Sequence, residues 1–147
     1  MTFQILPLPA EPFAPLFSLS DEDLAARLAR RVHVDSHPGY PCRISLADAE
    51  IGEAVILVNH EHLSVDTPYR SSHAIYVREG VTPHTPHPGH VPDAIARRLI
   101  SFRMFDASGA MLGADVVQGT GLAPALEEAF TDPEVSFIHL HNARQGC

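Results

Sequence analysis

Apolar residues recur at helical spacing in two parts of the chain, and elsewhere they form short runs or alternate with polar residues. After Ser20, whose hydroxyl can cap a helix, Leu24, Leu28 and Val32 recur every four residues and would share one helical face. Acidic residues follow this cap and arginines precede Val32, so the charges also complement a helix dipole. We therefore predict a helix over residues 21–31.

A second helical pattern lies near the C-terminus, and β-patterns lie between the two helices. Leu122, Leu126 and Ala129 give the second helix its apolar face, with Pro124 in its first turn. Continuous or alternating apolar runs predict strands at about residues 42–46, 54–62, 72–79 and 135–141.

The order of the predicted elements favours an α+β fold. Two more apolar runs, 99–105 and 111–117, flank the turn residues D-A-S-G and predict a β-hairpin. The resulting order lacks the regular alternation of strand and helix that doubly wound folds show. We predict a single α+β domain over residues 1–147, with a largely antiparallel sheet of five or six strands and two main helices. Residues 1–17 form a proline-rich lead-in, and its phenylalanines indicate that it packs on the domain.

The composition suits one globular domain and argues against two classes of partner. The 147 residues are 45% hydrophobic, which is enough to bury a core. The formal charge is −8 and no basic stripe is present, which argues against binding to nucleic acid or to an anionic membrane surface. No apolar run reaches the ~18 residues of a membrane span, and prolines interrupt the N-terminal segment where a signal peptide needs an apolar stretch. We therefore expect a cytoplasmic protein.

Two pairs of histidines stand at the ends of predicted strands. His60 and His62 close one strand, and His139 and His141 close the last one. Residues two apart in a strand point to the same face, so each pair presents two imidazoles together. Such a pair suits a divalent transition metal, or it marks only a strand that emerges into solvent. If the two strands were parallel neighbours, four imidazoles would gather at one end of the sheet; if they were antiparallel, the pairs would lie at opposite ends.

The two cysteines are candidate nucleophiles. Cys147 with His139 or His141 would make a thiolate–imidazolium pair, for which Asn142 would be an orienting group. Cys42 is the other candidate, because the neighbouring Arg43 would lower the pKa of its thiol. The alternative for each cysteine is a buried and inert thiol.

A third group of residues suits the binding of an anionic ligand. Arg43 and Arg70 can each clamp a carboxylate or a phosphate with two hydrogen bonds, and Tyr69 precedes Arg70. The alternative is that these arginines pair with the abundant acidic residues at the surface. No glycine-rich phosphate loop and no other nucleotide-binding motif occurs, so we expect no nucleotide cofactor.

Three segments of the chain resemble one known family. They are P-C-R-I-S-L-A-D-A-E-I-G-E, H-L-S-V-D-T-P-Y-R-S-S-H-A-I-Y-V-R-E and F-I-H-L-H-N-A-R-Q-G-C, and they match in this order. The family is an uncharacterised bacterial one, the domain of unknown function number twelve hundred and three. The resemblance extends from about Phe3 to Cys147 and implies a small single-domain bacterial protein. It implies no reaction, ligand or catalytic residue.

Two functional hypotheses follow. The first is a domain that binds a small ligand or a metal through a His/Cys/Arg site, built from the last strand and from segments 42–43 and 69–70. The residues leave open whether such a domain is an enzyme. The second is a non-catalytic protein-interaction module, suggested by the apolar N-terminus and the acidic surface, and a homodimer through residues 1–17 would favour it.

Overall fold

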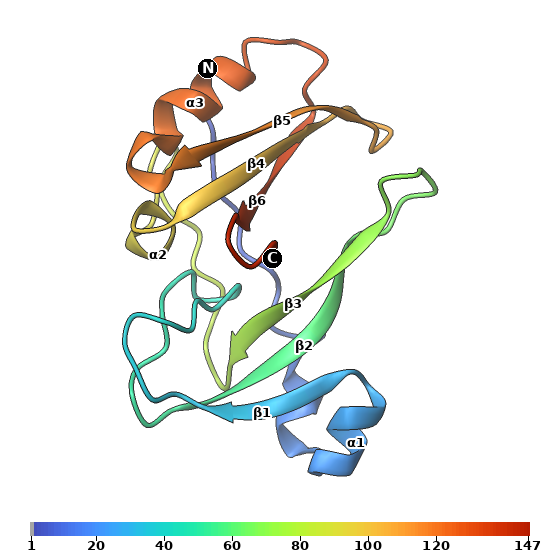
Figure 1. Cartoon of the computed structure of the whole chain (residues 1–147), viewed down its shortest axis with the longest axis vertical. Helices are drawn as coiled ribbons and strands as arrows, with labels where there is room; N and C mark the ends of the chain where they lie inside the picture. The colour runs from blue at the N-terminus through green and yellow to red at the C-terminus, as the bar shows by residue number, and fades with distance from the viewer. Residues whose placement is uncertain (1) are drawn as a thin grey trace. The chain divides into compact units, whose positions relative to one another are not determined.

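The computed structural model describes residues 2–147 and folds them into two three-stranded antiparallel sheets with few helices (Figure 1). The first sheet has the strand order β1-β2-β3, with β1 (Ala29–His33), β2 (Ala54–Leu63) and β3 (Ser71–Arg78). The second has the order β5-β4-β6, with β4 (Leu99–Phe105), β5 (Met111–Gln118) and β6 (Phe137–Asn142).

The helices are short and lie outside the sheets. They are α1 (Asp21–Ala26), α2 (Asp93–Ala96) and α3 (Leu122–Ala129), with the 3-10 turns η1 (Ala14–Ser18) and η2 (Gly119–Gly121). The α+β class and the antiparallel pairing are confirmed. The prediction of one sheet of five or six strands with two main helices is wrong in detail, because the strands divide into two sheets. Apolar alternation identifies a strand, but it does not identify the strand that will pair with it.

The chain divides into two compact units. Unit 1 contains residues 2–5, 61–73 and 86–147, and unit 2 contains residues 6–60 and 74–85. The prediction of a single domain over the whole chain stays a prediction. Among residues 2–147, no helix combines the length and the apolar character needed to cross a membrane.

The first predicted helix begins where expected and ends early. The Ser20 hydroxyl accepts a hydrogen bond from the backbone N–H of Asp23 at 3.1 Å, and Leu24 is fully buried. The helix ends at Ala26, and Leu28 then adopts a left-handed conformation with φ of +54°. Residues 29–31, predicted as the last helical turn, instead belong to strand β1, which pairs with β2. A helix this short is marginal on its own, so strand pairing overrides its helical spacing.

The predicted strand at 42–46 is also wrong. Cys42 makes one isolated bridge with Tyr76, and the chain then turns, with the N–H of Leu46 bonded to the carbonyl of Cys42 at 3.1 Å. Leu46 also has a φ of +54°. The strands predicted at 54–62, 72–79 and 135–141 are confirmed within about two residues, an ordinary boundary error.

The β4–β5 hairpin has the expected turn. Asp106 accepts hydrogen bonds from the backbone N–H groups of Ser108 and Ala110, at 2.8 and 3.0 Å. Gly109 follows with a φ of +85°, and a Cβ there would lie 2.5 Å from a methyl group of Val65. Glycine is therefore required at this turn both for its backbone conformation and for its lack of a side chain.

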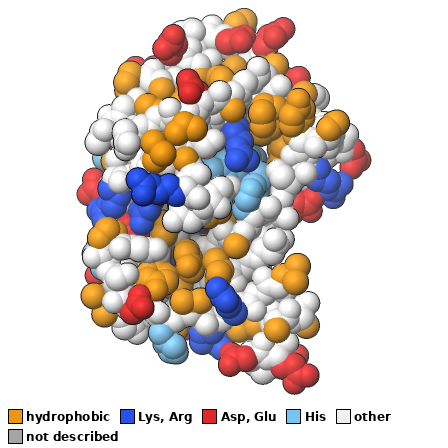
Figure 2. Space-filling view, viewed as in Figure 1, with side chains coloured by type: hydrophobic (Ala, Val, Ile, Leu, Met, Phe, Trp, Pro, Cys, Tyr) orange, Lys and Arg blue, Asp and Glu red, His pale blue; other side chains and the backbone are white. Residues whose placement is uncertain are grey.

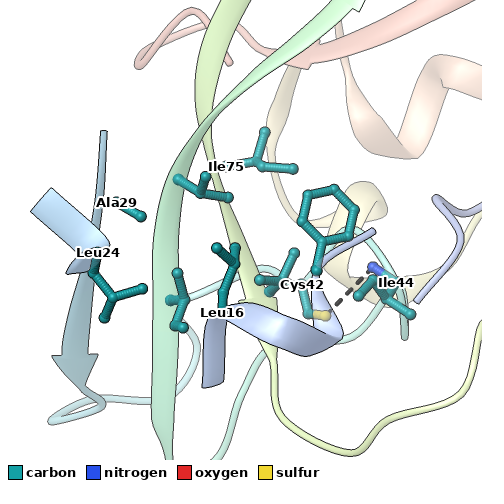
Figure 3. Close-up of a cluster of buried hydrophobic side chains, with 10 residues drawn as sticks. Leu16, Leu24, Ala29, Cys42, Ile44 and Ile75 are labelled. Atoms are coloured by element: carbon teal, nitrogen blue, oxygen red, sulfur yellow. Dashed lines mark hydrogen bonds between the residues drawn. The ribbon is translucent and has the colours of Figure 1, made fainter. Parts of the chain in front are cut away.

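Unit 2 is built around an apolar core to which the lead-in contributes. Figure 3 shows Leu16 beside Leu24, Ala29, Cys42 and Ile75. Phe13 is buried in the same cluster, and Phe17 packs against it. Phe13, Leu16 and Phe17 of the lead-in therefore supply core packing to unit 2, and the packing of the whole lead-in on one domain stays a prediction. Burial of each such side chain contributes roughly 1.5–3 kcal/mol to folding.

The two faces of the second sheet in unit 1 differ in chemistry. Ile100 and Phe102 of β4 are buried, and α3 adds Leu122 and Leu126 to the buried apolar residues of the unit. Alternation puts the odd-numbered residues of β4 on the opposite face. There Ser101 lies opposite His141 of β6, Arg103 opposite His139 and Phe105 opposite Phe137. This second face carries the candidate site.

The turn at Leu28 leads to a test of the fold. We expect Leu24→Ala to lower the free energy of unfolding by about 2–5 kcal/mol, because it leaves a cavity at a fully buried position. The matched substitution Leu28→Ala should cost about 0.5 kcal/mol or less, because Leu28 is 71% exposed. Urea unfolding of both variants measures the difference. Equal losses would contradict the turn and favour the continuous helix over residues 21–31.

Candidate metal centre

Three histidines from three different strands converge in unit 1. They are His62 of β2, His73 of β3 and His141 of β6, and one ring nitrogen from each lies within 4.8 Å of the others. The ring centroid of His62 lies 4.9 Å from that of His73 and 4.7 Å from that of His141. Such a group can hold a metal ion, because neutral imidazole is a common ligand of transition metals.

The local structure of each segment explains this convergence. His62 and His73 stand near the two ends of the segment that links β2 to β3, so a turn of the chain brings them together. Ser71 lies in the same segment, and its hydroxyl donates to the carbonyl of Tyr69 at 3.0 Å and lies 3.2 Å from His62 Nε2. His141 comes from a distant part of the sequence and is positioned by the pairing of β6 with β4.

Direct contacts between ring nitrogens link the histidines. His62 Nε2 lies 2.8 Å from His73 Nδ1, and His62 Nδ1 lies 3.2 Å from His139 Nδ1. Each contact needs one proton between two nitrogens, because two bare lone pairs would repel each other. His62 is thus the central ring of the group, with a second imidazole at each of its nitrogens.

His141 is the most buried member of the group. His141 is only 5% exposed, and its Nε2 atom has no hydrogen-bond partner within the described chain, residues 2–147. Burial, followed by the charge of Arg103 and by the neighbouring histidines, lowers the pKa of His141 to about 3. The ring is therefore neutral at pH 7, and an unprotonated nitrogen keeps a lone pair that can bind a metal.

His73 and His139 complete the surroundings. Burial, followed by the nearby Arg103, lowers the pKa of His73 as well. His139 contacts the rings of Phe105 and Phe137, with centroid distances of 5.3 and 5.2 Å. His139 therefore lies beside two aromatic side chains, and a cation lies near His73.

Comparison with known proteins identifies the family. The family model described as "Protein of unknown function (DUF1203)" matches residues 39–147. The chain belongs to this family. No curated protein and no solved structure matches it. The region that the DUF1203 model matches contains His139 as well as the three converging histidines, His62, His73 and His141.

In this DUF1203 protein, three of the four histidines predicted as metal ligands lie together and the fourth lies elsewhere. His62, His139 and His141 lie together, although β2 and β6 belong to different sheets and are not neighbouring strands. This arrangement differs from both alternatives, parallel or antiparallel neighbours, because the side chains meet without pairing of the two strands. His60 belongs to unit 2, where its ring packs edge-on against Phe13 at 5.6 Å.

The C-terminal residues form a turn of their own. The backbone N–H of Asn142 donates to the carbonyl of Cys147, and the N–H of Gly146 donates to the carbonyl of Asn142 at 2.8 Å. Gly146 has a φ of +81°, which this turn requires. Cys147 is half-buried, and Asn142 belongs to the even-numbered face of β6, away from that of His139 and His141. The nucleophile pairing of Cys147 stays a prediction.

Tyr69 and Arg70 lie at the exposed tip of the β2–β3 connection. Tyr69 is 41% exposed. Arg70 is exposed and forms salt bridges with Glu61 and Asp66. Arg70 thus has the acidic partners that the alternative interpretation expects of it, and exposed pairs of this kind contribute little to stability.

Cys42 and Arg43 belong to unit 2. Cys42 is buried, and its Sγ accepts a hydrogen bond at 3.4 Å from the backbone N–H of Ile44 (Figure 3). The backbone N–H groups of Ser45 and Arg78 also donate to this Sγ, each at 3.4 Å. Arg43 donates to the carbonyl of Pro41 at 3.4 Å, and its backbone N–H bonds to the carbonyl of Tyr76. The proposed nucleophilic role of Cys42 and the ligand-binding role of Arg43 stay predictions.

Sequence reasoning missed His73 and Arg103. His73 is a lone histidine in a strand pattern and has no partner two residues away. One signal was available: the runs over 54–62 and 72–79 are close in the sequence, and their pairing as a hairpin would bring His62 and His73 to the same end. Arg103 lies inside the β4–β5 hairpin, where nothing local distinguishes it from a surface arginine.

The lowered pKa of His141 leads to a pH prediction for the metal-free protein. An unfolded histidine takes up a proton below about pH 6.5, whereas folded His141 resists protonation down to about pH 3. Stability should therefore be full above about pH 6.5 and should fall as the pH decreases. We expect His141→Gln to lose less stability than wild type between pH 7 and pH 5, by about 1–2 kcal/mol.

Urea unfolding in the presence of a chelator measures this difference. His90→Gln is the matched control, because His90 is exposed in the loop before α2. Its pH dependence should equal that of wild type. If His141→Gln and wild type lose the same stability between the two pH values, His141 does not remain neutral in the folded protein.

Proposed function

We propose that this protein binds a divalent transition metal, with zinc as the leading candidate, through His62, His73 and His141. The observation that carries the proposal is the buried Nε2 atom of His141, which faces no hydrogen-bond partner within residues 2–147 and belongs to a group of three converging imidazoles. The bound metal would leave room for a small-molecule ligand.

The energetics favour a ligand at this nitrogen. A buried polar atom without a partner costs roughly 1–3 kcal/mol. Histidines that serve only as core residues normally satisfy their ring nitrogens with hydrogen bonds. A metal ion would satisfy His141 and would also replace the proton that the His62–His73 contact now requires.

The geometry is close to that of a metal site. Tetrahedral coordination with Zn–N bonds of about 2.0–2.1 Å separates ligand nitrogens by roughly 3.3 Å. The three nitrogens here lie within 4.8 Å of one another, so small side-chain rotations would close the group around an ion. The pKa directions agree, because both His73 and His141 are kept neutral by burial.

His139 suits a supporting role. A metal-binding imidazole usually donates its other N–H to a second group, which fixes the orientation of the ring. If His62 binds through Nε2, its Nδ1 faces His139 Nδ1 at 3.2 Å. The contacts of His139 with Phe105 and Phe137 would in turn hold that partner in place.

The donor set resembles that of reactive rather than structural metal sites. Structural zinc has four protein ligands, whereas catalytic zinc has three and keeps one position for water or substrate. A metal held by three neutral imidazoles would act as a Lewis acid and would lower the pKa of a bound water. The proposal therefore includes hydrolytic chemistry as the reaction class to test after metal binding itself.

Metal content tests the proposal directly. Protein prepared without a His-tag or a metal column should contain about one zinc, iron, copper or nickel ion per chain. His141→Ala and His73→Ala should each lose most of it, because each removes one of three ligands. His90→Ala, an exposed histidine outside the group, should keep it. Mass spectrometry of the elements measures all four proteins, with circular dichroism as the check of folding. Metal-free wild type that also fails to take up added zinc or cobalt would overturn the proposal.

Competition for zinc with a chromophoric chelator distinguishes a histidine that binds the metal from one that only supports a metal ligand. His139→Ala should weaken zinc binding by about 10–100-fold while keeping one ion per chain, the effect typical of removing a supporting group. Loss of a ligand in His73→Ala should weaken it considerably more. Equal losses in the two variants would make His139 a ligand of the same rank.

A further inference from the structure

Arg103 adds a positive charge to the surroundings of the three histidines. It lies on β4 directly opposite His139 of β6, and the neighbouring pair in the same face is Ser101 with His141. Residues opposite each other in an antiparallel pair have their Cβ atoms about 4.5–5.5 Å apart, on the same side of the sheet. Arg103 therefore shares the face of His139 and His141.

The side chain of Arg103 has no protein partner within residues 2–147. Arg103 is half-buried, yet its guanidinium makes no hydrogen bond and no salt bridge within those residues. The other half-buried arginines differ. Arg31 pairs with Asp21, Arg78 binds Glu53 through two bonds of 2.9 Å, and Arg43 and Arg98 donate to backbone carbonyls. Acids outnumber arginines by 18 to 10, so a shortage of carboxylates does not explain this.

Within residues 2–147, no salt bridge balances the positive charge of the Arg103 guanidinium. Arg103 shares its face of the sheet with His139 and His141, so its charge lies on the same side of the sheet as their rings. A divalent ion in the same place would add two more positive charges and no negative one. Opposite charge is needed nearby, because partly buried like charges repel strongly.

We propose that the ligand of this centre is a small oxyanion, with one oxygen bound to the metal and another bound to the guanidinium of Arg103. The inference rests on the proposed metal-binding function and names the chemical class of its ligand. Carboxylates and phosphates share the required chemistry, because each carries at least two oxygens, so one can bind the metal while another accepts hydrogen bonds from the guanidinium. Figure 2 shows arginine side chains beside histidine side chains on the surface that it draws.

Cobalt-substituted protein provides a direct test. Co²⁺ is added to the whole metal-free protein, and its visible absorption reports both binding and a change of ligands at the metal. Oxalate and inorganic phosphate are then titrated separately as probes, which distinguishes a carboxylate site from a phosphate site. Arg103→Gln removes the charge and Arg103→Lys keeps it. Arg97→Gln, at an exposed position of the same unit, is the matched control.

We expect at least one probe to change the cobalt spectrum of wild type and of Arg97→Gln at similar concentrations. Arg103→Gln should bind Co²⁺ as wild type does, or slightly more tightly, and should weaken the probe by about tenfold or more. Arg103→Lys should fall between them, because it keeps the charge and loses the paired donors.

The outcomes separate this inference from the proposed function. If Co²⁺ binds and neither probe changes its spectrum, or if Arg103→Gln binds the probes as wild type does, the oxyanion inference is overturned and the metal site stands. If Co²⁺ does not bind to wild type, both proposals fall.

Discussion

The antiparallel register between β4 and β6 is the constraint on which the candidate site depends. It puts His139 opposite Arg103 and His141 opposite Ser101, all on one face of the second sheet. A slip of one residue would turn both histidines to the face that carries Ile100 and Phe102, where imidazoles would disrupt apolar packing. The apolar pairs around them, such as Phe105 with Phe137, therefore determine the position of the site as well as the stability of the sheet.

The same register gathers groups that cannot all be charged. Four imidazoles and one guanidinium share the site, and no carboxylate is among the causes of the lowered pKa of His141. Burial makes the neutral forms of His73 and His141 the stable ones, and neutral rings then contact each other without repulsion. The cost of this arrangement is that one ring nitrogen of His141 has no hydrogen bond to any of residues 2–147. Stability and binding thus depend on the same atoms, as is common where a fold keeps a locally unfavourable group at a functional site.

The local parts of this structure follow from the sequence, and the non-local parts do not. The strand that ends in His62, the last strand and the β4–β5 hairpin each have a local apolar pattern that predicts them. Both errors of secondary structure, the long first helix and the strand at 42–46, occur at a leucine with positive φ, namely Leu28 and Leu46. Leucine rarely adopts that conformation, so no sequence pattern announces the turn. The partition into two sheets and the arrival of His73 and Arg103 at the site depend on pairing between distant segments, which periodicity does not encode.

Metal binding at this site would also bear on folding. His62 and His73 belong to the segment 61–73, whereas His141 belongs to β6. An ion held by all three would therefore join two parts of unit 1 that are far apart in the sequence. A ligand that binds the folded form alone stabilises it in proportion to the logarithm of its concentration over its dissociation constant. The site is absent from the unfolded chain, because its members come from three strands. The free energy of metal binding would therefore count directly toward the stability of unit 1. The burial of His141 Nε2, which has no hydrogen-bond partner within residues 2–147, would then favour tight binding of the ion.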